Sequence, residues 1–263
     1  MLPTGRWNGS DVMHGARCGH HRRRLSAPLL AALTLAAPCV TAAPPAPPAL
    51  RKPTMADTVR ANVYADNWFQ LYVNGELVAV DSIAFIPHNV VSVDILPRYP
   101  MTIAVLAKDN ADPTTGMEYA NTNVGDGGFI LRFGDGTVTD GTWKAKCFSR
   151  GPVNGDTRTP RVESTPLPPD WFAVGFDDGD WQQAREYREE EIDPKQPYYD
   201  ADFSGARFIW TDDVKLDNVV VFRHVVPAPP DGKSRPDFSN LNDVVPQGPP
   251  KGGGRRPPGG RPR

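Results

Sequence analysis

The sequence has few cysteines and histidines, the two residue types that most often bind transition metals. It contains three cysteines and five histidines in 263 residues. Two of the cysteines lie in residues 1–42, so the rest of the chain holds only Cys147 and cannot form an internal disulfide. Past residue 42 the histidines are His88 and His224. A zinc site built on histidine and cysteine is therefore excluded, and Cys147 is predicted to be a buried apolar residue.

The sequence also lacks a long apolar run and a stretch with good helical periodicity. The apolar run at residues 25–37 is broken by Pro28 and is well under the roughly 20 residues that cross a bilayer. The stretch nearest to a helix, residues 181–192, carries a run of glutamates in place of an apolar stripe. Neither a transmembrane anchor nor a helical fold is expected.

Motifs of common enzymes are missing as well. No Gly-x-Ser-x-Gly elbow is present, and the glycine-rich run at residues 125–128 precedes a strand pattern, so it indicates a turn and not a phosphate loop. A glycosidase needs two carboxylates at a fixed separation, and no spacing in this chain selects a pair. The sequence predicts a protein that is not an enzyme. The alternative is a glycoside hydrolase with an unrecognised carboxylate pair.

Charge is distributed unevenly along the chain. The whole sequence has 29 basic and 31 acidic residues. Residues 1–42 hold 5 basic and 1 acidic residue, and residues 246–263 hold 5 and 0, which leaves 19 against 30 in between. A body this acidic repels the phosphate backbone, so nucleic acid is not expected as its partner.

Both ends of the chain have the composition of segments outside a folded domain. Residues 1–42 show the order of a secretory signal peptide, with a basic stretch, an apolar run and small residues before a cleavage point. Residues 43–56 form a proline-rich spacer, and residues 229–263 form a Pro-, Gly- and Arg-rich tail that is expected to be disordered. The folded domain is predicted at residues 57–228, and the expected location is secreted or periplasmic.

A β-hairpin is predicted over residues 66–81. Apolar side chains recur at every second position, at Phe69, Leu71 and Val73. The pair Asn74-Gly75 follows, and both residues tolerate the positive φ of a tight type I′ turn.

Further strand patterns follow along the chain, separated by Asn, Asp, Gly and Pro. They cover residues 59–65, 89–96, 101–108, 128–133, 142–148 and 218–226. Residues 101–108 are apolar at both alternating sets of positions, which indicates a strand buried on both faces. Short strands joined by polar turns predict an all-β fold, an antiparallel β-sandwich or barrel.

Two long connections interrupt the strand pattern. The first, residues 109–127, is rich in oxygen-bearing side chains, and the second, residues 149–170, has five prolines and is too proline-rich for a strand ladder. Connections of this length tend to be binding loops or disordered segments.

The first connection offers a candidate metal site. Ca²⁺ takes oxygen ligands at irregular spacing. This connection supplies Asp109, Asn110, Asp112, Asn121, Asn123 and Asp126. We predict a calcium site on Asp109, Asp112 and Asp126, without the spacing of an EF-hand.

Two groups of residues have the composition of a carbohydrate site, an aromatic face with planar hydrogen-bonding groups beside it. One lies around Tyr119 and the other at Tyr198-Tyr199. The candidate carbohydrate-binding residues are Asp109, Asn110, Tyr119, Asn121, Asn123, Tyr198 and Tyr199. For each group, simple anchoring of the loop is the alternative.

Four short motifs follow one another along the chain. They are the hairpin ending in Val73-Asn74-Gly75, a DG-turn-W segment at residues 135–144, FDDGDWQQA at residues 176–184, and ARFIW at residues 206–210 followed by VFR at 221–223. Together they resemble the galactose-binding-like β-sandwich modules that accompany bacterial glycoside hydrolases, notably the accessory jelly-roll domains of α-L-rhamnosidases. The resemblance implies a jelly-roll sandwich, a carbohydrate ligand and, often, a structural calcium. In physical terms the motif residues suit turns and core packing, so they identify a fold and not a site.

The sequence thus predicts an exported, non-catalytic, lectin-like module that binds carbohydrate or an envelope polysaccharide. A structural or protein-interaction module of the cell envelope, with the basic tail as a contact, is the alternative. A glycoside hydrolase is the third hypothesis.

Overall fold

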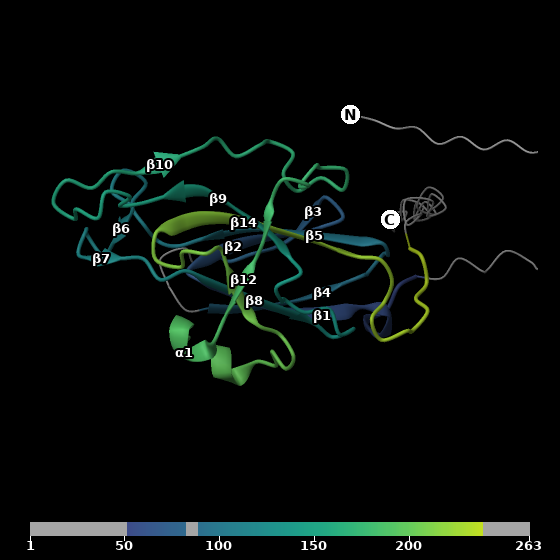
Figure 1. Ribbon diagram of the computed structural model, residues 1–263. Helices are drawn as coiled ribbons and strands as arrows, with labels where there is room; N and C mark the ends of the chain where they lie inside the picture. Colours follow the sequence, from purple (N-terminus) through teal and green to yellow (C-terminus); the bar gives the residue numbers. More distant parts are fainter. Residues whose placement is uncertain (1–51, 83–88, 239–263) are drawn as a thin grey trace, which may run out of the picture. The chain divides into compact units, whose positions relative to one another are not determined.

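The computed structural model describes residues 52–82 and 89–238 of the chain (Figure 1). The predicted signal peptide, most of the spacer, His88 and the last 25 residues of the predicted tail lie outside the described residues. No helix in the described ranges is long and apolar enough to span a bilayer.

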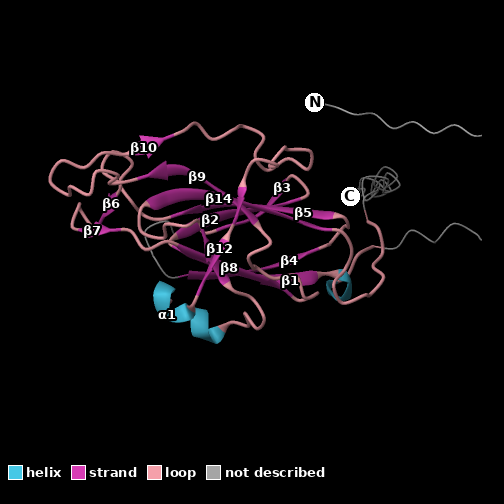
Figure 2. Ribbon diagram, viewed as in Figure 1, coloured by secondary structure: helices cyan, strands magenta, loops and turns pink. Residues whose placement is uncertain are grey.

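Two antiparallel sheets face each other as the two layers of a sandwich (Figures 1 and 2). The first sheet has five strands in the order β12-β13-β8-β1-β4. These strands are β1 (Val59–Asp66), β4 (Asn89–Ile95), β8 (Gly128–Phe133), β12 (Arg185–Tyr187) and β13 (Phe208–Trp210). The predicted all-β antiparallel sandwich is confirmed.

The second sheet has the order β10-β9-β14-β5-β2-β3, with β11 paired to β9. Its strands are β2 (Trp68–Val73), β3 (Glu76–Val80), β5 (Met101–Lys108), β9 (Lys144–Arg150), β10 (Glu163–Ser164), β11 (Gln182–Gln183) and β14 (Asp217–Val226). A separate two-stranded ribbon joins β6 (Met117–Glu118) to β7 (Asn123–Val124). Helical turns are confined to η1 (Met55–Asp57), α1 (Glu189–Ile192) and η2 (Tyr198–Asp200) in the described part of the chain.

The predicted hairpin is present as β2 and β3. Phe69, Leu71 and Val73 are buried, and the turn residues Asn74 and Gly75 have φ values of 50° and 84°. Glycine relieves the steric cost of this turn because it has no Cβ. The alternation along β2 therefore faces the core as the sequence predicted.

Apolar side chains from both sheets fill the space between the layers. Every residue of β5 except the last is buried, as predicted for a strand covered on both faces. Phe129 of the first sheet stacks on Phe222 of the second, with ring centroids 5.2 Å apart. Trp143 and Trp210 are completely buried in the same core. Large aromatic side chains thus supply much of the buried apolar surface.

The outer face of the second sheet is covered by residues 151–181, which we call the strap. Trp171 and Trp181 of the strap pack with Leu106, Phe148 and Val221 in a second apolar cluster. The prediction that the proline-rich connection carries no ladder is wrong at one point, because β10 pairs with β9. Although the strap contains many prolines, the apolar side chains in its later part pack it against the sheet.

The stretch at residues 181–192 divides into β11, β12 and the four-residue helix α1, as expected for a stretch that lacks an apolar stripe for a longer helix to bury. One other prediction needs correction. Cys147 is half-buried and not fully buried. Its thiol lies 3.2 Å from the Ser149 carbonyl oxygen, and burial raises the pKa of Cys147 to about 12.

Candidate cation-binding site

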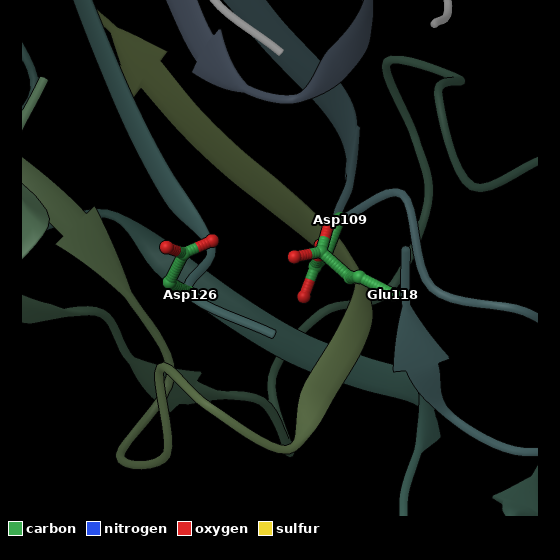
Figure 3. Close-up of side chains that lie close together, drawn as sticks. All are labelled: Asp109, Glu118 and Asp126. Carbon is green, nitrogen blue, oxygen red and sulfur yellow. The ribbon is translucent and has the colours of Figure 1, made fainter. Parts of the chain in front are cut away.

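Three carboxylates from the long connection between β5 and β8 come together at one end of the sandwich. They belong to Asp109, Glu118 and Asp126, and one oxygen of each lies within 4.8 Å of the others. Figure 3 shows the carboxylates of Asp109 and Glu118 against each other, with Asp126 beside them. No other group of three or more acidic, histidine or cysteine side chains converges in this way within residues 52–82 and 89–238.

Local backbone structure places each of the three side chains. Asp109 directly follows β5, and its N–H donates to the carbonyl of Asn218 on β14 over 3.0 Å. Glu118 ends β6, and the chain then reverses through Tyr119, Ala120 and Asn121, which all have left-handed φ values. Asp126 precedes β8. The loop therefore returns its two later carboxylates to the end of β5.

Gly125 makes the close approach of Asp109 possible. A Cβ built on Gly125 would lie 1.6 Å from the Oδ2 atom of Asp109. Only glycine leaves room for the carboxylate at this position.

The buried oxygens of the cluster are mostly without hydrogen-bond donors. Asp109 and Glu118 are each only 2% exposed. Both carboxylate oxygens of Asp109 and one of Glu118 have no hydrogen-bond partner in the described part of the chain. Burial of an ionised carboxylate without a partner is strongly unfavourable. Protonation or a bound cation must therefore neutralise them.

A fourth buried oxygen points into the same space. Asn218 is 4% exposed, and its Nδ2 atom donates to the carbonyls of Gly151 and Gly116 over 3.3 and 3.5 Å. These bonds fix the amide so that Oδ1 lies 3.3 Å from the Cβ position of Gly125, the position that Asp109 Oδ2 also approaches. The Oδ1 atom has no partner among the described residues. It adds a neutral oxygen to the three carboxylates.

The raised pKa values of two acidic groups show that burying these carboxylates together is unfavourable. Burial, followed by contact with Glu118, raises the pKa of Asp109 to about 10. Burial, followed by the charges of Asp126 and Glu118, raises the pKa of Asp66 at the end of β1 to about 8, although Lys195 acts in the opposite direction. Neighbouring acidic groups thus raise the proton affinity of Asp109 and Asp66. A bound cation would favour the ionised forms of the same groups.

The oxygen-only donor set fits a hard divalent cation. Ca²⁺ accepts carboxylate and amide oxygens in flexible geometry, whereas Zn²⁺ prefers histidine and cysteine. Asp109 and Glu118 are almost completely covered by protein, whereas the two carboxylates of a glycosidase must reach the sugar. The residues present therefore fit a Ca²⁺ site better than a hydrolytic pair.

The structure brings together two of the three predicted metal ligands. Asp109 and Asp126 belong to the cluster, and Asp112 does not. The exposed Asp112 carboxylate instead accepts hydrogen bonds from the Thr114 N–H and hydroxyl and from the Thr115 N–H. It stabilises a turn within the loop.

The predicted asparagines surround the cluster without joining it. The Asn110 N–H donates to Asn67 Oδ1, and Asn121 Oδ1 accepts from the Thr115 hydroxyl, each over 2.5 Å. Asn123 is exposed on β7, opposite Glu118. Asn121 thus has the loop-anchoring contact that was the alternative to a ligand-binding one.

The predicted tyrosines differ in exposure. Tyr119 is 54% exposed and directly follows Glu118, and burial together with the charges of Glu118 and Asp126 raises its pKa. Tyr199 is similarly exposed, whereas Tyr198 is half-buried and stacks on Phe203 with ring centroids 5.2 Å apart. Tyr119 is therefore the exposed aromatic residue beside the candidate cation site.

The cluster residue Glu118 and two residues near the cluster, Asp66 and Asn218, were not singled out from the sequence. Glu118 lies in the same oxygen-rich connection, which was the available signal, but its acidic side chain was not singled out. Asp66 and Asn218 are far from the connection in sequence, and only strand pairing brings them to it.

No family model, curated protein or solved structure matches this chain. Its function is therefore argued from the chemistry and geometry of the site.

Proposed function

We propose that the protein is an exported, non-catalytic carbohydrate-binding module whose binding loop holds a divalent cation, best Ca²⁺. The observation that carries the proposal is the set of buried, unpartnered oxygens on Asp109, Glu118 and Asn218. With Asp126 they offer four side chains to one cation, and backbone carbonyls or water can supply the remainder of its six to eight ligands.

The cation would act mainly through the loop that it organises. Residues 109–127 join β5 of one sheet to β8 of the other, and they carry Tyr119 on the surface directly after Glu118. An exposed aromatic ring beside polar side chains is the composition that stacks on and hydrogen-bonds to a sugar. The resemblance to galactose-binding-like modules, together with a leader of signal-peptide composition, supports carbohydrate binding outside the cytoplasm.

The burial of the acids supports a non-catalytic role. A glycosidase must bring both carboxylates to the sugar, and Asp109 and Glu118 are almost completely covered by protein. Burial suits ligands of a structural cation better than a general acid and a nucleophile.

Calorimetric titration of the full chain with CaCl₂ tests the cation. We expect one saturable site, and at least about tenfold weaker binding in Asp109→Asn and in Glu118→Gln, because each loses a charged ligand. Asp112→Asn is the matched control from the same loop and should bind as the wild type does. Equal binding in all four proteins would refute the site.

A glycan array with and without calcium tests the carbohydrate ligand. We expect retention of at least one glycan that is weakened by EDTA and by Tyr119→Ala, whereas Leu77→Ala, an exposed apolar residue on β3, has no effect. Binding to protein partners alone would favour the envelope-interaction hypothesis. Turnover of aryl glycosides would favour the hydrolase.

A further inference from the structure

A second concave site lies at the first sheet, where the edge strand β12 meets α1 and η2. It is a pocket of about 520 Å³, within the roughly 300–1,000 Å³ typical of small-ligand sites. None of the cation-cluster residues lines it. The ARFIW motif contributes Ala206, Arg207 and Phe208 to its wall, although the proposed cation site makes no use of this motif.

Part of the pocket wall is apolar. Ile130 of β8 and Phe208 of β13 are almost fully buried, and the half-buried ring of Tyr198 lies beside Phe208, with centroids 5.3 Å apart. Such a surface suits the C–H face of a sugar ring, which is apolar although the hydroxyls around it are polar.

The rest of the wall alternates acidic and basic planar groups. Glu186, Arg188, Glu189, Glu190 and Arg207 supply it. Three acids against two bases leave little net charge, so neither an anion nor a cation is strongly favoured. A hydroxyl group both donates and accepts hydrogen bonds, so a polyol can satisfy guanidinium and carboxylate groups together.

Some of these groups are already held in place, and two are free to bind. Glu186 Oε1 accepts from the Gly141 N–H over 2.8 Å, and the Tyr198 hydroxyl lies 3.3 Å from Glu189 Oε2. The Arg207 guanidinium and the Glu190 carboxylate make no hydrogen bond or ion pair within the described residues, although the Glu190 charge helps to raise the pKa of Arg188. Hydrogen bonds thus hold part of the pocket wall in place, and two of its charged side chains have no hydrogen bond within the described residues.

We infer that this pocket is a second saccharide subsite, which takes one neutral pyranose unit and does not need the cation. The inference rests on the proposed carbohydrate-binding function and adds to it the class of sugar unit and the residues that hold it. Tyr198, packed on the buried Phe208, contacts the ring face, and Arg207 and Glu190 bind its hydroxyls.

Saturation-transfer NMR of the full chain with a panel of neutral methyl glycosides tests the subsite. The panel contains hexopyranosides, 6-deoxyhexopyranosides and pentopyranosides, each measured with CaCl₂ and with EDTA. We expect transfer to at least one glycoside in both conditions. Arg207→Ala and Glu190→Ala should each raise its dissociation constant at least about tenfold, because each removes a charged hydrogen-bonding group. Arg158→Ala, an exposed arginine of the strap, is the control and should bind normally.

The outcomes separate this inference from the proposed function. Transfer that survives both pocket substitutions, or that disappears in EDTA, overturns the second subsite and leaves cation-dependent binding at Tyr119 intact. Absence of transfer to every glycoside also overturns the subsite, and the glycan array then decides the proposed function separately. Both pocket substitutions are on exposed residues, and unchanged thermal midpoints will show that the variants fold.

Discussion

At the scale of single residues, the absence of a side chain at Gly125 matters as much as the acidic side chains of the cluster. The carboxylate of Asp109 occupies the space that a side chain on Gly125 would fill. The proposed cation binding therefore depends on a glycine that itself offers no side-chain ligand.

Gly125→Ala should weaken Ca²⁺ binding at least about tenfold, because the added methyl group forces the Asp109 carboxylate out of the cluster. Calorimetric titration measures the change. Gly175→Ala is the matched control, since a Cβ at Gly175 meets nothing within 4 Å. Normal calcium affinity in Gly125→Ala would show that Asp109 is not a ligand.

His224 offers a residue-scale test of pH dependence. Its ring is half-buried and stacks on Trp143 with centroids 5.1 Å apart, and burial lowers its pKa below the usual value. The unfolded chain therefore binds a proton at a higher pH than the folded protein does. The contribution of His224 to stability is complete above a pH of about 6.5 and is lost as pH falls from there toward the folded-state pKa.

Urea unfolding of the wild type and of His224→Phe between pH 5 and 8 isolates this effect. We expect the wild type to lose stability relative to the variant as pH falls below about 6.5, because phenylalanine keeps the stacking and cannot take up a proton. A constant difference between the two proteins across this range would contradict the prediction.

At the scale of elements, Arg223 fastens the strap to the sheet. This arginine of β14 is buried, and its Nε atom lies 2.7 Å from Asp178 Oδ2. Its other nitrogens donate to the carbonyls of Trp171 and Ala173. One side chain thus joins three positions of the strap to the centre of the second sheet.

Arg223→Met should lower the free energy of unfolding by about 2–4 kcal/mol, because methionine fills the space but leaves a carboxylate and two carbonyls without donors. Urea unfolding measures the loss. Arg60→Met is the control, because the Arg60–Asp94 pair is exposed and solvent already screens it, so little change is expected. Equal effects of the two substitutions would show that the strap is held by its aromatic cluster alone.

At the scale of the whole molecule, the cation cluster joins the two sheets. Asp109 continues from β5 of the second sheet, and Asp126 leads into β8 of the first. A ligand that binds only the folded state adds to the stability of that state.

Calcium at about 100 times its dissociation constant should stabilise the fold by about 2.7 kcal/mol. For a domain of this size that corresponds to a rise in thermal midpoint of roughly 5–10 °C. Scanning calorimetry with CaCl₂ and with EDTA measures the shift, and Glu118→Gln should remove most of it. A midpoint that does not respond to calcium in the wild type would argue against a cation between the sheets.

Much of the architecture was predictable because it depends on short-range pattern. Alternating apolar residues placed β2, and the Asn74-Gly75 pair placed the turn after it, since two-residue hairpin loops accept few residue types. The continuous apolar run of β5 likewise indicated burial on both faces. The strap was harder to predict, because its aromatic residues form no periodic pattern and find their partners on a distant sheet.

The sequence alone determined that this chain is β-rich, that it carries an oxygen-rich connection, and that past residue 42 its histidines and cysteines are only His88, Cys147 and His224. Only the tertiary structure decided which oxygens meet. Asp66, Asp109, Glu118 and Asn218 lie on separate strands or beside them, and strand pairing buries them together. The burial of oxygens of Asp109, Glu118 and Asn218 without hydrogen-bond donors depends on neighbours in space, which spacing along a chain does not encode.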